Sequence, residues 1–379
     1  MRFAFAIVSM FPGGGLQRDC VDIARRVKKL GHEVTIFTSR LYDKEFAKDL
    51  PLHVLSNGKK TNHGGQRAFS DDFNKVASGK FDLLVGFDKL SGLDVLYCSD
   101  RSMAARTARN PVLRLLPRYW KFIELEKDCF ARERKTEILL LNESQLNEYW
   151  SAWTTEPNRL IMLPPTLVHK RHRPEFRTDG TREKWRSRLG LSPHDWVWIS
   201  VGVQPKTKGI DRSIRALRHF PDVHFLIVGL DEHDEKSTVI RRLAQRLGVA
   251  HQIKWLGHSE DIPELMAAAD VFLHPARYDT TGTVILEAII NGLPVITTSA
   301  CGYAKHVRSA DAGIVIQEPF RQRTLLIALE TARDAACLAR WSKFGSEYGN
   351  QRSLYEGKNR ATELIVARGM EGSKAAGQS

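Results

Sequence analysis

Acidic residues and a glycine in the second half of the chain are of types suited to binding a phosphorylated sugar. Seven residues separate Asp279 from Glu287, and Gly282 and Thr283 lie between them. Glycine permits a tight turn, and the amides of a helix that begins there would point at phosphate. Glu287 could accept hydrogen bonds from two ribose hydroxyls, and Asp279 from hydroxyls of a hexose. The alternative is that Asp279 caps the helix and Glu287 is a surface charge.

Two nearby lysines offer positive charge for the same kind of ligand. Lys206 and Lys208 follow a strand that the apolar pattern predicts at 197–201, and a helix is expected to begin near Asp211. Amines at the carboxyl end of such a strand can neutralise a diphosphate. The alternative is a solvated basic turn.

A glycine run at 13–15 follows the first predicted strand. Its backbone can approach a ligand closely, and the N-terminus of the next helix favours an anion. The alternative is a plain tight turn. Because the run is not G-x-G-x-x-G, the sequence disfavours an NAD-dependent oxidoreductase.

The elements that position these residues alternate between strands and amphipathic helices. In the first half we predict strands at 3–8, 34–37, 52–55, 81–87, 138–141 and 160–163. In the second half we predict them at 197–201, 224–228, 253–256, 271–274, 295–298 and 313–316. This order predicts an α/β fold with two Rossmann-like, doubly wound domains. Ligands of such sheets bind at the carboxyl ends of the strands, so we expect a cleft between the domains.

The domain boundary is placed at Pro164-Pro165, where a charged stretch begins. We expect a first domain at 1–166 and a second domain at 167–345. A helix at 346–371 is expected to return to the first domain, followed by a disordered tail at 372–379.

Composition narrows the classes of partner and site. The net charge of +13 favours a polyanion: nucleic acid, an acidic membrane surface or a phosphorylated substrate. Five cysteines without a C-x-x-C pair argue against a disulfide framework and a zinc site. No apolar run is long enough to span a bilayer, and no signal peptide is recognisable, so we expect a cytoplasmic protein. The acidic segment 231–235 is interpreted as a solvated loop, and no metal site is predicted.

The segment 101–134 combines cations with apolar residues at helical spacing. A basic amphipathic helix with aromatic residues binds anionic membrane surfaces. The residues expected at the membrane are Arg109, Arg114, Arg118, Trp120 and Lys121. The alternative is that the apolar stripe packs on the first sheet and the charges face solvent. Outside this segment aromatic and basic residues do not interleave, which disfavours nucleic acid.

Together these motifs resemble the retaining family 4 glycosyltransferases of the GT-B fold. The spacing from Asp279 to Glu287 is similar to the two-glutamate motif of that family. The wider match, over about residues 1–360, is to its lipopolysaccharide core glucosyltransferases. The segments that carry it are 11–19, 92–95, 265–270, 274–276 and 301–304.

The resemblance implies roles for the donor-binding residues. Gly14 and Gly15 match the loop under the donor phosphates, and Lys208 matches the phosphate-binding lysine. Glu287 matches the ribose-binding glutamate. Gly282 and Thr283 match the diphosphate-binding turn.

Some positions depart from the family pattern or match it less closely. The arginine often found before the lysine is Thr207 here, and Lys206 is expected to replace it. Asp279 stands where the family usually has Glu, which leaves the donor hexose open. Asp19 and Asp100 match acidic positions near the reacting centre, and with Asp279 they are the expected catalytic residues. Arg171 follows the interdomain prolines and is expected to reach the donor.

The implied activity is transfer of a hexose, glucose first, from a UDP-sugar to a heptose of the lipopolysaccharide inner core. Transfer would proceed with retention and without metal, with the UDP-sugar as co-substrate and no other cofactor. The acceptor would be a phosphorylated, lipid-linked oligosaccharide on the cytoplasmic face of the inner membrane. The resemblance implies that the first domain binds this acceptor and the membrane, and that the second binds the nucleotide-sugar. The alternatives are another lipid-linked, capsular or exopolysaccharide acceptor, or a non-catalytic membrane- or nucleic-acid-binding protein with this fold.

Overall fold

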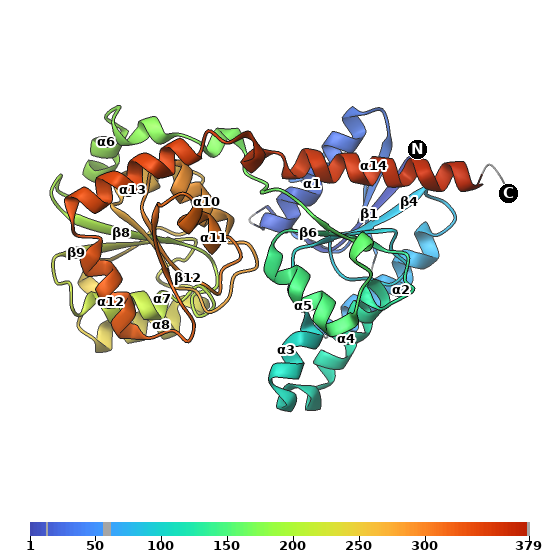
Figure 1. Ribbon diagram of the computed structural model, residues 1–379, viewed down its shortest axis with the longest axis horizontal. Helices are drawn as coiled ribbons and strands as arrows, with labels where there is room; N and C mark the ends of the chain where they lie inside the picture. Colours follow the sequence, from blue (N-terminus) through green and yellow to red (C-terminus); the bar gives the residue numbers. More distant parts are fainter. Residues whose placement is uncertain (13, 56–61, 377–379) are drawn as a thin grey trace. The chain divides into compact units, whose positions relative to one another are not determined.

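The computed structural model describes residues 1–12, 14–55 and 62–376, which form two compact units (Figure 1). Unit 1 contains residues 1–165 and the C-terminal segment from 356, and unit 2 contains residues 166–355. Each unit has its own parallel sheet with helices on both faces. This is the doubly wound architecture that the strand–helix alternation predicts.

In the described part of unit 1 the sheet has seven strands in the order β3-β2-β1-β4-β5-β6-β7. They are β1 (Arg2–Met10), β2 (Glu33–Leu41), β3 (Leu52–Val54), β4 (Leu83–Gly86), β5 (Val95–Cys98), β6 (Glu137–Leu140) and β7 (Leu160–Met162). The direction of winding reverses between β1 and β4, which is the switch point where such sheets bind ligands.

The helices of unit 1 cover the two faces of this sheet. They are α1 (Gly15–Lys29), α2 (Asn62–Ala77), α3 (Met103–Arg109), α4 (Pro117–Phe130), α5 (Glu143–Trp153) and α14 (Gly357–Ala376). Side chains of β1 alternate between faces: Phe3 and Phe5 pack in the core with α1 and α14. Ala4 and Ala6 pack in the other core, with α2, α4 and α5.

In the described part of unit 2 the sheet has six strands in the order β10-β9-β8-β11-β12-β13. They are β8 (Trp196–Val201), β9 (Val223–Val228), β10 (Ile253–Trp255), β11 (Val271–His274), β12 (Val295–Thr298) and β13 (Gly313–Ile316). The switch point lies between β8 and β11.

Eight helices surround this sheet in the described part of unit 2. They are α6 (Thr181–Arg188), α7 (Ile210–Leu217), α8 (Thr238–Arg246), α9 (Ile262–Ala268), α10 (Thr283–Ile290), α11 (Ala304–Ser309), α12 (Gln322–Thr331) and α13 (Ala335–Tyr348). On β8, Val197 and Ile199 pack in the core with α9, α10 and α11. Trp198 packs in the opposite core, with α7, α8 and α12.

The structure differs from the sequence predictions at one strand and at the C-terminus. Strand β5 was not predicted, because four apolar residues between Asp94 and Ser99 give no clear periodicity. The returning helix is α14, which begins at Gly357 and continues to Ala376, beyond the predicted end at 371. The predicted disordered tail is therefore wrong for 372–376, where lysine and alanine favour helix, and 377–379 lie outside the described residues.

Candidate active site

The switch point of unit 2 brings a lysine and an aspartate together. Lys208 lies in the loop after β8, and Asp279 lies in the loop after β11. The Lys208 Nζ is 2.6 Å from Asp279 Oδ2, and the side chains of both are largely buried. Two residues 71 positions apart thus meet because their strands are neighbours in the sheet.

A buried histidine completes this cluster. The Nε2 of His274, the last residue of β11, is 2.9 Å from the same Asp279 oxygen. Burial alone would lower the pKa of His274, but the hydrogen bond with Asp279 and the nearby Cys301 raise that pKa to about 9. Burial would raise the pKa of Asp279, but His274 and Lys208 outweigh it and lower that pKa to about 2. At neutral pH two cations therefore surround one anion, and the excess positive charge suits a phosphate.

The turn before α10 leaves helix amides available to a ligand. Gly282 is the N-cap residue with φ +76°, and no side chain caps this helix end. The backbone N–H groups of Tyr303 and Gly302 donate to the carbonyls of Thr281 (2.7 Å) and Asp279 (3.0 Å) and so hold the turn. The carboxylate of Asp279 does not cap α10, so the alternative role weighed for it is wrong. A positive helix terminus of this kind attracts phosphate.

The loop after β8 packs against the loop after β11. Gly209 has φ +74°, and a Cβ there would lie 2.0 Å from the Pro275 carbonyl oxygen, so only glycine fits. The Arg277 guanidinium donates to the Lys206 carbonyl at 2.7 Å and pairs with Asp211 at 2.6 Å. This packing fixes the backbone on either side of Lys208, whereas the side chain of Lys206 is exposed.

Two other predicted donor-binding residues lie at and beyond this turn, and Arg171 lies in the 3₁₀ turn His169–Arg171 of the same unit. Thr283 is the first residue of α10, and Glu287 is partly buried farther along that helix. Arg171 donates through Nη1 to the Glu260 carbonyl at 3.0 Å. The structure brings Lys208, Asp279 and Gly282 together, while contact of Glu287 and Arg171 with the donor stays a prediction.

In unit 1 the predicted residues lie at the carboxyl side of the sheet. Gly14 is the N-cap residue of α1, and a Cβ there would lie 1.8 Å from Gln17 Oε1. A Cβ on Gly15 would meet nothing within 4 Å, so packing does not require that glycine.

Asp19 and Asp100 have different surroundings. Asp19 accepts a hydrogen bond from the Tyr97 hydroxyl at 2.9 Å and pairs with Lys358 at 3.1 Å. Burial raises the pKa of Asp19 more than Lys358 and Tyr97 lower it. Asp100 follows β5 and is exposed. Whether either carboxylate meets the donor site of unit 2 stays a prediction.

The segment 101–134 is not one continuous helix. Helix α3 ends at Arg109, a 3₁₀ turn occupies Pro111–Leu115, and α4 begins at Pro117. Asn110 and Leu116 have non-helical backbone angles, as expected before proline. We call α3, this turn and α4 the hairpin, which projects from the sheet of unit 1 (Figure 1).

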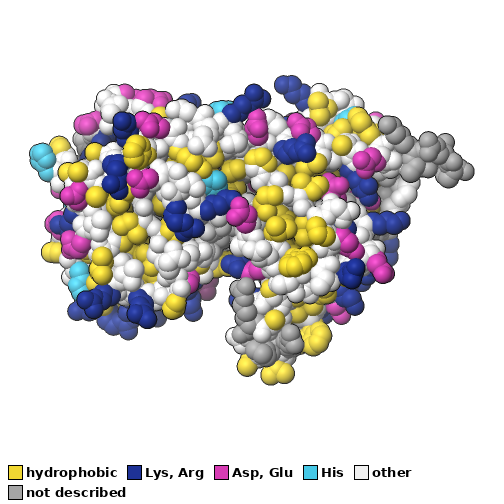
Figure 2. All heavy atoms as spheres, viewed as in Figure 1, with side chains coloured by type: hydrophobic (Ala, Val, Ile, Leu, Met, Phe, Trp, Pro, Cys, Tyr) yellow, Lys and Arg dark blue, Asp and Glu magenta, His cyan; other side chains and the backbone are white. Residues whose placement is uncertain are grey.

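The end of the hairpin exposes apolar side chains. Leu115 is 81% exposed and Trp120 is 57% exposed, so this part of the stripe does not pack on the sheet. Arg118 and Lys121 are exposed beside them, whereas the side chains of Arg109 and Arg114 lie outside those described. Figure 2 shows hydrophobic atoms gathered at this end of the unit.

His274 is a site residue that sequence reasoning missed. It was noted as part of the 274–276 segment but not as a member of the site. The available signal was its position: it ends a predicted strand and precedes Pro275, at the point where the sheet reverses its winding.

Comparison with known proteins places this geometry in a family. Residues 181–332 match the model of the glycosyl transferases group 1. The lipopolysaccharide glucosyltransferase WaaG of Escherichia coli is 33% identical over 381 residues, which cover 98% of this chain and 100% of that protein. The chain belongs to the group 1 glycosyltransferases.

Solved structures agree on the fold. The crystal structure of WaaG, a glycosyltransferase involved in lipopolysaccharide biosynthesis, has a TM-score of 0.90 with 33% identity, covering 96% of this chain and 99% of that one. Anabaena Alr3699/HepE in complex with UDP-glucose has a TM-score of 0.70 at 18% identity, over 100% of both chains, and supports the fold alone. The family, its GT-B fold and the resemblance to core glucosyltransferases are therefore confirmed.

Two further observations concern membranes and metals. No helix in the described ranges is both long and apolar enough to cross a bilayer. Within the same ranges, no three His, Cys, Asp or Glu side chains are grouped as metal ligands would be. The loop 231–235 is held by hydrogen bonds within the loop, such as the one from His233 N to Asp231 Oδ1 at 2.9 Å.

All five cysteines are free thiols, and four of them are buried.

Proposed function

We propose that this glycosyltransferase transfers glucose from UDP-glucose to a heptose of the lipopolysaccharide inner core. The observation that carries the proposal is the positive cluster at the switch point of unit 2, in a chain similar over its whole length to a lipopolysaccharide glucosyltransferase. In this proposal unit 2 binds the nucleotide-sugar and unit 1 binds the acceptor.

The donor diphosphate lies against Lys208 and the uncapped N-terminus of α10. In that position the ammonium group and the helix amides stabilise the charge that develops on the leaving phosphate. Glu287 accepts hydrogen bonds from the ribose hydroxyls, and Asp279 accepts them from the hexose. The positive charge of Lys208, His274 and the amides does the work that a metal ion does in other glycosyltransferases, so transfer proceeds without one.

Transfer proceeds with retention on one face of the sugar. The bond from the anomeric carbon to the phosphate oxygen breaks, and a bond to the acceptor hydroxyl oxygen forms on the same face. The acceptor proton passes to the departing phosphate oxygen. No protein nucleophile is required, so the role of the site is to orient the reactants and stabilise charge.

The hairpin attaches the enzyme to the cytoplasmic face of the inner membrane, where the lipid-linked acceptor lies. Exposed Leu115 and Trp120 enter the headgroup region, and Arg118 and Lys121 face anionic lipid. Each cation near such a surface contributes about 1 kcal/mol.

Donor binding and hydrolysis with a panel of UDP-, GDP- and ADP-sugars test the donor half of this proposal. We expect UDP-glucose to bind and to be hydrolysed slowly, and Glu287→Ala to abolish both. Glu330→Ala, an exposed glutamate on α12, is the matched control and retains both. If no nucleotide-sugar binds at millimolar concentration, the assignment of the switch-point cluster as a donor site is wrong.

A further inference from the structure

Lys89 and Glu126 form a buried ion pair in unit 1, far in sequence from the donor site. Lys89 follows β4, Glu126 lies in α4, and their Nζ and Oε2 atoms are 2.9 Å apart. Glu126 is fully buried and Lys89 nearly so. Burial disfavours both charges, but neighbouring groups together outweigh it: Glu126 and other acidic groups raise the pKa of Lys89, and Lys89 with hydrogen-bond donors lowers the pKa of Glu126. Burying two charges costs free energy that their mutual attraction often does not return. The other hydrogen bonds to the pair therefore indicate its role.

The remaining hydrogen bonds of Glu126 go chiefly to the start of α3. The Ser102 hydroxyl donates to Oε1 at 2.6 Å, and the backbone N–H groups of Met103 and Ala104 donate at 2.7 and 3.2 Å. Trp153 of α5 donates to the same carboxylate at 2.8 Å. A negative charge here stabilises the first turn of a helix. Glu126 therefore fixes the N-terminus of α3 to α4.

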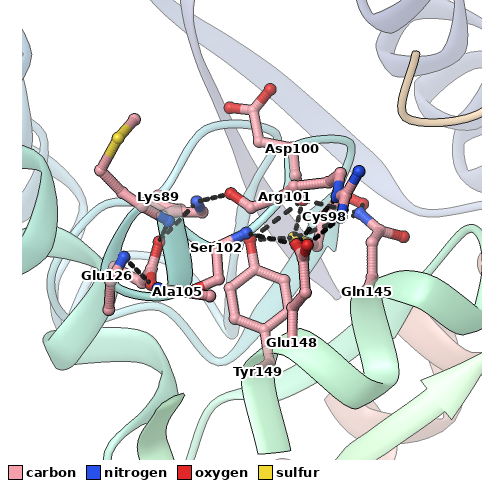
Figure 3. Close-up of polar contacts among 12 residues, drawn as sticks. Lys89, Cys98, Asp100, Arg101, Ser102, Ala105, Glu126, Gln145, Glu148 and Tyr149 are labelled. Carbon is pink, nitrogen blue, oxygen red and sulfur yellow. Dashed lines mark hydrogen bonds and ion pairs between the residues drawn. The ribbon is translucent and has the colours of Figure 1, made fainter. Parts of the chain in front are cut away.

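The backbone immediately before α3 is held by further side chains. Lys89 Nζ donates to the Arg101 carbonyl at 3.0 Å. The Asp100 carbonyl accepts hydrogen bonds from Gln145 Nε2 at 2.7 Å and from the Tyr149 hydroxyl at 3.0 Å. Figure 3 shows these contacts converging on the segment between β5 and α3. Backbone groups of positions 100, 101, 103 and 104 are thus bound in succession.

The carboxylate of Asp100 itself is not part of this network. It is exposed, and in Figure 3 it points away from the cluster. Within the described ranges no residue donates a hydrogen bond to it. The held backbone fixes where the Asp100 side chain begins, and its exposed carboxylate keeps its hydrogen-bonding capacity for a ligand.

We infer that Glu126 is a positioning residue for sugar transfer: with Lys89 it holds the backbone that presents Asp100 to hydroxyls of the acceptor sugar. The inference rests on the proposed function, in which unit 1 binds the acceptor. Glu126 does not touch the substrate, and it acts through the segment 100–104. Because α3 and α4 also form the hairpin, the same carboxylate joins the membrane-binding element to the acceptor-binding residue.

Glu126→Gln tests this inference, because the amide keeps the shape of the side chain and removes its charge. Hydrolysis of UDP-glucose and transfer of glucose to a heptose-terminated core acceptor are measured on the same enzyme sample. We expect kcat/KM for the acceptor to fall about 100-fold, since a misplacement of about 1 Å costs that much. Hydrolysis and KM for the donor change less than about twofold. Glu124→Gln, an exposed glutamate on the same helix, is the control and leaves all of them unchanged.

Retention of wild-type transfer by Glu126→Gln would overturn the inference while leaving the proposed function intact. Absence of transfer by the wild type would overturn both. A loss of folded enzyme lowers hydrolysis and transfer in proportion, so an unchanged ratio of the two in Glu126→Gln also overturns the inference.

A second variant separates positioning from stability. Lys89→Met with Glu126→Gln removes both charges, so neither partner is left as an unpaired buried ion, and it keeps a carbonyl acceptor for the donors at the start of α3. We expect its thermal unfolding to lie near that of the wild type while transfer stays low relative to hydrolysis. If transfer returns together with stability, the pair only stabilises the fold, and the positioning role is wrong.

Discussion

Asp279 stands where the resemblance predicts a glutamate, and its side chain has two charged neighbours in the structure. Its Oδ2 atom accepts hydrogen bonds from both Lys208 and His274, and these two contacts hold the short side chain in the cationic cluster. A glutamate in this position would extend the carboxylate by about 1.5 Å, one carbon–carbon bond. We propose that Asp279 contacts the hexose, and Lys208 and His274 set how far its carboxylate can reach.

Asp279→Glu is expected to change which UDP-hexose is used while leaving UDP affinity nearly unchanged. The longer side chain moves the carboxylate toward the sugar hydroxyls, and hydrogen bonds to such groups discriminate strongly between substrates. We expect the ratio of kcat/KM for UDP-glucose and UDP-galactose to change roughly tenfold or more. Steady-state kinetics with both donors measure it. An unchanged ratio would show that Asp279 does not contact the hexose.

His274 makes stability depend on pH in a defined direction. Its pKa is raised from 6.5 to about 9 in the folded protein. The stabilisation is therefore complete below about pH 6.5 and is lost as the pH rises through about 9.

We expect His274→Gln to lower the free energy of unfolding by roughly 2–3 kcal/mol more at pH 6 than at pH 10. Urea denaturation of both proteins across this range measures the difference. His219→Gln, an exposed histidine of the same unit, is the control. A cost of His274→Gln that does not vary with pH would contradict the assignment of a charged imidazole.

The sequence reveals those site residues whose signal is local. Lys208, Gly282 and Glu287 belong to short motifs, so their types and spacing suffice to propose a phosphate site. His274 and Glu126 have no such motif. Their contacts with other site residues form only in the tertiary structure, where β8 lies beside β11 and α4 packs against the segment after β5.

At the scale of elements, prolines decide the shape of the basic segment. The apolar residues within 101–134 lie at helical spacing, but Pro111 and Pro117 force the preceding residues out of helical geometry. The resulting hairpin places Leu115 and Trp120 at an exposed end. A long helix on the sheet would have buried part of that stripe.

Leu115→Asp is expected to weaken binding to anionic vesicles at least tenfold, because it replaces an inserted apolar side chain with a negative charge that anionic lipids repel. Co-sedimentation with phosphatidylglycerol-containing vesicles measures the affinity. Leu30→Asp, an equally radical change at an exposed leucine at the end of α1, is the control. Binding that survives Leu115→Asp would show that the hairpin end is not the membrane contact.

At the scale of the molecule, the chain folds into two units with separate hydrophobic cores. Strand–helix alternation predicted both sheets, because buried parallel strands are continuous apolar runs that can be recognised locally. The return of α14 to unit 1 depends on Ala361, Ile365 and Val366 packing with β1 side chains. A short apolar face does not indicate which sheet it packs on. The partner and the exact bounds of α14 therefore came from the structure.

Separate cores predict that the units unfold as distinct cooperative steps. UDP, which we propose binds unit 2, is expected to raise the midpoint of only one step. At one hundred times its dissociation constant a ligand adds about 2.7 kcal/mol to the stability of the unit that binds it. Scanning calorimetry with and without UDP checks this. One transition that shifts as a whole would contradict independent units.

Transfer of labelled glucose from UDP-glucose to purified, heptose-terminated lipopolysaccharide core tests the proposed function most directly. We predict that label enters the acceptor and that the new linkage keeps the α configuration of the donor, as seen by nuclear magnetic resonance of the product. Hydrolysis of UDP-glucose without any transfer to this acceptor, or a product with inverted configuration, would contradict the proposal.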